Sequence, residues 1–155
     1  MRRRQASKIE AAPDPKFASR LVAKFINILM EAGKKNVAEN IVYGAFKILE
    51  DKTQESGLKV FNKAMDNVRP RLEVKGRRVG GATYQVPVEV PANRGNSIAM
   101  RWVRDFARKK KGRPMTIKLA DELLAAYKGE GAAIKKRDDT HKMAESNKAF
   151  SHLRW

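Results

Sequence analysis

Residues 72–91 read LEVKGRRVGGATYQVPVEVP, and their apolar residues follow a period that differs from the rest of the chain. Apolar and polar residues alternate on both sides of a Gly-Gly pair, which is the pattern of two β-strands joined by a turn. An odd-length loop over residues 80–82 would keep the apolar residues of both strands on one face, with Val74 opposite Val88. The sequence therefore predicts a β-hairpin, and such a two-stranded ribbon alone is marginally stable in water.

On both sides of this ribbon, apolar residues recur at intervals of three and four, the period of amphipathic helices. Pro and Gly residues bound these segments, as they do at helix ends. In the second helix Val37 and Val42 are expected on the inward face. The expected helices begin after Pro15, near Asn36, near Leu58, after Pro91 and at Pro114, and a weaker one covers residues 132–148.

These segments together predict a mainly α fold, a helical bundle of about six helices with one protruding β-hairpin arm. At 155 residues the chain is long enough for one hydrophobic core. No boundary divides it, so residues 1–155 form a single domain in this interpretation. Residues 1–12 lack periodicity and are expected to form a flexible basic arm.

The charge of the chain is its strongest compositional signal. Thirty-four Lys and Arg residues face seventeen acids, for a net charge of +17. Residues 36–70 carry five bases and five acids, whereas residues 94–118 carry nine bases against one acid. A surface charged unevenly in this way attracts polyanions to particular regions. The sequence therefore predicts a defined anionic partner.

The residues that most enzymes and metal sites use are scarce. The chain has no cysteine, which removes disulfides, thiolate ligands and thiol nucleophiles. His141 and His152 lie among basic residues, so we interpret both as surface residues rather than general bases. A zinc site needs three or four ligands, and the sequence contains no GxxxxGK[ST] or GxGxxG phosphate loop. We therefore expect that the protein is not an enzyme and that it has no metal site and no cofactor.

No apolar run approaches the roughly 18 residues that a membrane span needs. The basic start, MRRRQASKIEAAP, is not followed by the apolar stretch of a secretory signal. Basic helices can lie on anionic lipid, but here the apolar faces are needed for the core. The lack of disulfides fits a reducing compartment, so the sequence indicates a cytosolic protein with no membrane partner.

Cationic residues are arranged as a nucleic-acid-binding protein requires. Arg101, Arg104, Arg108 and Lys111 recur at helical spacing and form a predicted cationic stripe. Three further basic residues, at positions 2–4, belong to the expected N-terminal arm. Arg side chains bind phosphate bidentately and stack on bases. An arm, a ribbon and a helical stripe together suit the irregular shapes of folded RNA better than a DNA groove.

The sequence leaves one question about the aromatic residues open. Tyr84, near the ribbon tip, and Trp155 have aromatic rings that can stack on bases, and local packing explains either residue equally well.

Four segments are similar to a known family: KFASRLVAKFINILMEAGKK, NVRPRLEVKGRRVGGATYQVPVEV, RW at 101–102, and AIKKRDDTHKMAESNKAFSHLRW. They closely resemble the bacterial family of the seventh small-subunit ribosomal protein, in order and over nearly the whole chain. The resemblance implies a helical bundle with an extended ribbon that binds the ribosomal RNA of the small-subunit head and organises its assembly. It also implies a cytoplasmic location in the ribosome, with neighbouring ribosomal proteins as partners.

The resemblance also assigns expected contacts. By the resemblance, the ribbon is expected to lie near the exit-site transfer RNA and the messenger path. The residues expected to approach them are Lys75, Arg77, Arg78, Gly80, Gly81 and Tyr84. Charge and position then select the residues expected to bind ribosomal RNA: Arg2, Arg3, Arg4, Lys8, Lys34, Lys35, Arg94, Arg101, Arg108, Lys109, Lys110, Arg113, Lys118 and Lys142.

Two alternative functions remain. A protein that compacts nucleic acid without a defined site would explain the charge, but not the neutral section or the ribbon. An RNA-modifying enzyme would need a catalytic set, and the sequence shows none. Equal affinity for arbitrary duplexes would favour the first alternative, and turnover of an RNA substrate would favour the second.

Overall fold

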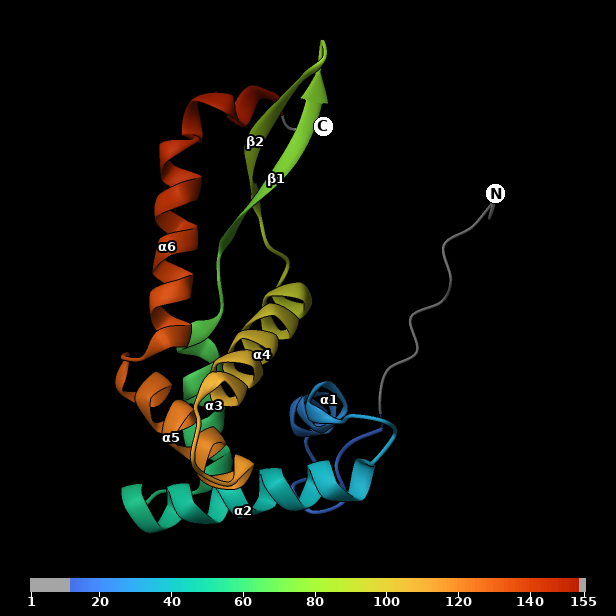
Figure 1. Cartoon of the computed structure of the whole chain (residues 1–155), viewed down its shortest axis with the longest axis vertical. Helices are drawn as coiled ribbons and strands as arrows, with labels where there is room; N and C mark the ends of the chain where they lie inside the picture. The colour runs from blue at the N-terminus through green and yellow to red at the C-terminus, as the bar shows by residue number, and fades with distance from the viewer. Residues whose placement is uncertain (1–11, 154–155) are drawn as a thin grey trace.

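The computed structural model describes residues 12–153. Four of the expected RNA-binding residues, Arg2, Arg3, Arg4 and Lys8, lie outside this range, as does Trp155. Within it the elements are α1 (Arg20–Leu29), α2 (Lys35–Thr53), α3 (Gly57–Val68), β1 (Leu72–Val79), β2 (Ala82–Glu89), α4 (Ala92–Lys109), α5 (Met115–Lys128), α6 (Ala132–Ser146) and the 3-10 helix η1 (Lys148–Leu153). The predicted helical bundle with a β-hairpin arm is confirmed (Figure 1).

The core lies where α2, α3 and α5 pack against one another, with α1 and α4 beside them. Three phenylalanine rings pack against one another within it, in tilted pairs. The Phe25 and Phe46 centroids lie 5.2 and 5.3 Å from that of Phe61, and all three side chains are buried. Burial of such a side chain contributes about 1.5–3 kcal/mol to folding. None of the helices within residues 12–153 is both long and apolar enough to cross a membrane.

Helix α1 begins later than its apolar pattern predicts, because Asp14 organises a turn before it. The Asp14 carboxylate accepts hydrogen bonds from the backbone N–H groups of Lys16 and Phe17, at 3.1 and 3.0 Å, and from the Tyr43 hydroxyl at 2.7 Å. Burial and the Asp14 hydrogen bond raise the pKa of Tyr43 to about 12. Ser19 then caps α1 by accepting from the N–H of Val22. Residues 15–18 therefore form a turn rather than a first helical turn.

The hairpin has a different register from the one expected. Val79 pairs with Ala82 across a two-residue turn, so Val74 lies opposite Pro87 instead of Val88. The turn glycines, Gly80 and Gly81, have φ values of +57° and +88°. Positive φ at both central positions defines a type I′ turn, whose twist matches that of the strands. The local turn geometry thus sets the register, and the apolar residues of the two strands fall on opposite faces.

The ribbon is stabilised along its length by the C-terminal part of the chain. Helix α6 runs beside both strands, and η1 contacts β2 close to the tip (Figure 1). Val86 is completely buried, and the Tyr84 ring packs on Phe150 with centroids 5.3 Å apart. An isolated hairpin is marginally stable, and packing against these elements stabilises this one. The structure thus shows local packing of Tyr84, and its expected place near the exit-site transfer RNA stays a prediction.

Candidate nucleic-acid interface

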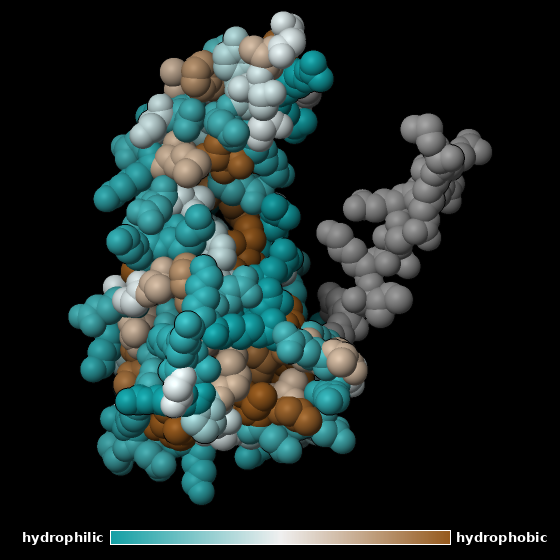
Figure 2. Space-filling view, viewed as in Figure 1, coloured by the Kyte–Doolittle hydropathy of each residue, from teal (hydrophilic) through white to brown (hydrophobic). Residues whose placement is uncertain are grey.

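Helix α4 starts at the root of the ribbon and carries exposed arginines along one side. Arg94, Arg101 and Arg108 are seven residues apart, or about two helical turns, so they recur on one side at intervals of roughly 10 Å. Hydrophilic residues also dominate the face of the molecule that Figure 2 shows. We call these three exposed residues, Arg94, Arg101 and Arg108, the α4 row.

Arg94 is held by a carboxylate of the ribbon. Its Nε lies 2.9 Å from Oε1 of Glu73, and its Nη2 lies 2.9 Å from Oε2. Lys75 contacts the same carboxylate at 3.2 Å. The hydrogen bond from Arg94 lowers the pKa of Glu73, although its partial burial acts in the opposite direction. Glu73 thus links β1 to the first turn of α4 as a charged acceptor for two cations.

Part of the expected stripe faces the protein itself. Arg104 donates to the carbonyl oxygen of Ile28 at 3.2 Å, and Arg108 donates to that of Leu29 at 3.1 Å. Arg108 also forms an ion pair with Glu31 at 2.8 Å. The last carbonyl groups of a helix lack intrahelical partners, so these arginines satisfy the end of α1. They join α1 to α4, and Arg104 is only half-exposed.

The connection between α4 and α5 contains a cation that neutralises a buried acid. The Nζ of Lys110 lies 2.7 Å from Oε2 of Glu122, whose side chain is 2% exposed. Oε1 of Glu122 accepts from the N–H of Ala133, in the first turn of α6. Lys109 lies over the Phe106 ring, 5.2 Å from its centroid. Lys110 therefore has a structural partner in the folded protein.

The other expected RNA-binding residues differ in their surroundings. Arg113 pairs with Asp121 at 3.4 Å, and Lys35 pairs with Glu39 at 3.6 Å. Lys34 and Lys142 are exposed and Lys118 is half-buried. On the ribbon, Arg78, Gly80 and Gly81 are exposed at the tip, whereas Arg77 is half-buried. The expected residues thus divide into the α4 row, the ribbon, and scattered lysines with Arg113 outside both.

Sequence reasoning missed two residues at this interface. Lys24 of α1 donates from Nζ to the carbonyl oxygen of Asn93 at 3.2 Å, which places another cation next to Arg94. Glu73 was not considered, although it is the only acid in residues 71–88. A single acid within a cationic strand is a signal for an internal partner, and this signal was available in the sequence.

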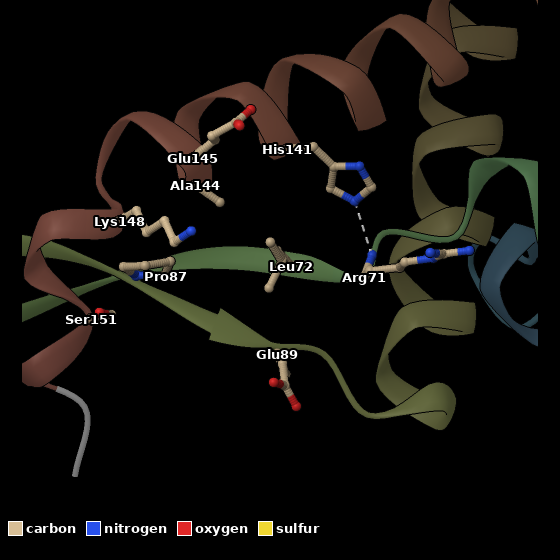
Figure 3. Close-up of a pocket in the computed structure, with 9 residues that line it drawn as sticks. All are labelled: Arg71, Leu72, Pro87, Glu89, His141, Ala144, Glu145, Lys148 and Ser151. Carbon is tan, nitrogen blue, oxygen red and sulfur yellow. Dashed lines mark hydrogen bonds between the residues drawn. The ribbon is translucent and has the colours of Figure 1, made fainter.

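A pocket of about 520 Å³ lies on the other side of the ribbon root, between β1, β2 and α6. Figure 3 shows His141 pointing from α6 to the backbone of Arg71, whose N–H donates to Nε2 at 3.0 Å. The carbonyl oxygen of Arg71 accepts from the N–H of Val90 at 2.9 Å. His141 therefore joins α6 to the ribbon root. Separately, residues 12–153 contain no group of three His, Cys, Asp or Glu side chains that could hold a metal ion.

This contact makes stability depend on pH. Burial, with the nearby Arg137, lowers the pKa of His141 below its ordinary value of 6.5. As the pH falls below about 6.5, the unfolded chain gains a proton that folded His141 does not, so the free energy of unfolding decreases. Above that range both states are neutral and the effect vanishes. Urea unfolding at several pH values should show a weaker pH dependence for His141→Gln than for the wild type, and equal dependence would contradict this.

Comparison with known proteins adds independent information. Residues 1–148 match the family described as Ribosomal protein S7p/S5e. Small ribosomal subunit protein uS7 of Thermotoga maritima is 58% identical over 155 residues, which is 100% of both chains. The proteins of the same name from Desulfatibacillum aliphaticivorans and Marinobacter nauticus are 54% and 56% identical over 154 residues, 99% of each chain. These matches confirm the resemblance found in the sequence: the chain belongs to the ribosomal protein S7p/S5e family.

Proposed function

We propose that the protein is a structural component of the small ribosomal subunit that binds the ribosomal RNA of the head directly and organises its assembly. The observation that carries this proposal is the α4 row, in which three exposed arginines follow one another along α4, starting at the ribbon root. Membership in a ribosomal protein family supports this proposal. It equally supports a cytoplasmic location in the ribosome, with other ribosomal proteins as neighbours. The protein is not an enzyme.

The mechanism is electrostatic and geometric. Close packing of RNA helices is opposed by phosphate repulsion, and Lys and Arg side chains relieve it while counterions are released. A rigid helix bundle then holds several RNA segments in one geometry, because its basic residues are fixed relative to one another. Double-stranded regions would be recognised by shape, and exposed loops by their bases.

A competition assay tests this function. The wild-type protein would be bound to a fluorescent RNA fragment of the small-subunit head at about 0.2 M salt, where non-specific phosphate binding is weakened. Duplex DNA and unrelated RNA serve as competitors. We expect the head fragment to compete at least tenfold better than either. Equal competition by all three would instead support a non-specific compacting protein.

We further propose that the ribbon tip lies near the exit-site transfer RNA and the messenger path. The support is its shape: the exposed tip carries Arg78 beyond the part of the ribbon that η1 covers. Removal of Arg78, Val79, Ala82 and Thr83 would shorten the ribbon by two residue pairs and keep the Gly80-Gly81 turn and the Tyr84–Phe150 contact.

Subunits assembled with this shortened ribbon should form normally but bind exit-site transfer RNA several-fold more weakly. The measurements are sedimentation of the assembled subunits and filter binding of deacylated transfer RNA to programmed ribosomes. Normal transfer-RNA binding by the shortened protein would refute the role of the tip and leave head binding untouched. Failure to assemble would show that the tip belongs to the RNA-docking surface instead.

A further inference from the structure

We propose that Glu73 positions Arg94 to bind one phosphate group of the RNA, and so contributes to selection of the correct RNA. The inference rests on the proposed function and concerns a residue of the opposite charge from those that attract RNA. The ribbon and the first turn of α4 are in contact where Arg94 reaches Glu73 of β1.

The Glu73 carboxylate contacts one edge of the Arg94 guanidinium. Nε donates to both carboxylate oxygens, at 2.9 and 3.1 Å, and Nη2 donates to Oε2 at 2.9 Å. Such paired hydrogen bonds fix the guanidinium plane as well as its position. The side chain of Glu73 is only 13% exposed, so the carboxylate itself has little freedom to move.

The opposite edge of the guanidinium is available to a second acceptor. A guanidinium has five N–H donors, and the contacts with Glu73 use one on Nε and one on Nη2. Within residues 12–153 no acceptor takes a hydrogen bond from Nη1 of Arg94, and 52% of the Arg94 side chain is exposed. One Nη1 hydrogen and the outer Nη2 hydrogen are parallel and form a second fork, which matches the oxygen spacing of a phosphate.

The local charge balance permits this arrangement next to RNA. Glu73 alone would repel phosphate, but Arg94 and Lys75 both contact its carboxylate, and the three residues together keep a net positive charge. An arginine whose rotamer is already fixed loses less conformational freedom on binding. It also presents its N–H donors in one direction, so a phosphate at another position binds to it more weakly.

This proposal and simple electrostatics predict opposite results for Glu73→Gln. Removing a negative charge beside RNA should strengthen binding if charge alone matters. If Glu73 positions Arg94, the variant should bind the head RNA fragment about 3- to 10-fold more weakly, because the guanidinium must be immobilised on binding. Binding to unrelated RNA should stay equal or become stronger, so the ratio between the two RNAs falls.

The experiment measures both affinities at about 0.2 M salt for wild type, Glu73→Gln and a matched control, Glu130→Gln. Glu130 is exposed after α5, so its substitution changes net charge equally and should leave the ratio as in the wild type. Arg94→Lys keeps the charge but loses the fork, and it should reproduce the effect of Glu73→Gln. The double variant should be no weaker than Arg94→Lys alone, because both changes remove one interaction.

The outcomes separate this inference from the proposed function. A wild-type preference for head RNA that Glu73→Gln leaves intact or increases would overturn the positioning role and keep the function. A wild-type protein without any preference would overturn both. Circular dichroism of each variant shows whether the fold is retained, and Arg94→Lys still tests the fork if Glu73→Gln fails to fold.

Discussion

Substitution of Lys110 by Met should decrease the free energy of unfolding by about 3 kcal/mol, the low end of the cost of breaking a buried ion pair. The variant leaves the Glu122 carboxylate 2% exposed and without its cation. The low end applies because the Lys110 side chain itself is 40% exposed. Urea denaturation followed by circular dichroism at neutral pH measures the change. A decrease below about 1 kcal/mol would show that water or another cation reaches Glu122.

The matched variant is Glu122→Gln, which removes the charge instead of its partner. Its amide oxygen can still accept from the N–H of Ala133, as Oε1 of Glu122 does. Lys110 can turn its ammonium group to solvent, so we expect a loss of only about 1 kcal/mol. An equal loss in both variants would mean that packing, rather than an uncompensated charge, determines the cost.

Most of the fold follows from the sequence because its signals are local. Helical periodicity, with Pro and Gly at the boundaries, located all six α-helices of the described chain. Pro114, for example, precedes α5 directly, and Gly129 ends that helix in a left-handed conformation. The alternating pattern likewise located both strands of the ribbon.

The errors concern features that the local pattern does not determine. Hydrophobic alternation favoured an odd loop, but the conformational freedom of the two turn glycines set the register. Val37, expected on the inward face of α2, is 54% exposed, because it lies in the first turn of α2 and lines an open surface pocket beside the end of α1. Helix η1 was missed, since six residues are too few for a periodic signal and its place depends on the ribbon.

The candidate site could be predicted only in part. Charge density located α4 and the ribbon, but not which cations are paired inside the protein. The partners come from distant segments: Arg108 contacts Glu31 of the α1–α2 connection, and Arg94 contacts Glu73. Such pairs depend on tertiary packing, which no spacing rule supplies. The total charge therefore overstates the number of cations that have no partner inside the protein.

An increase in salt from about 50 to 200 mM should weaken binding of the head RNA fragment about a thousandfold or more, if six to ten phosphates are neutralised. The cause is the release of counterions from RNA, which yields less free energy as the salt concentration rises. Fluorescence anisotropy over a salt series gives the slope of log affinity against log salt. A change below about tenfold would mean that only one or two phosphates are neutralised, which is too few for the α4 row and the ribbon together.

The slope also distinguishes free cations from paired ones. Arg101 donates no side-chain hydrogen bond to the described residues and forms no ion pair with them, so Arg101→Gln should reduce the slope by about 0.7–0.9, the value of one phosphate contact. Lys110→Met should leave the slope nearly unchanged, because Lys110 already neutralises Glu122. The two variants remove one positive charge each, so net charge alone predicts equal slopes. A loss of slope in Lys110→Met equal to that in Arg101→Gln would show that RNA competes with Glu122 for this lysine.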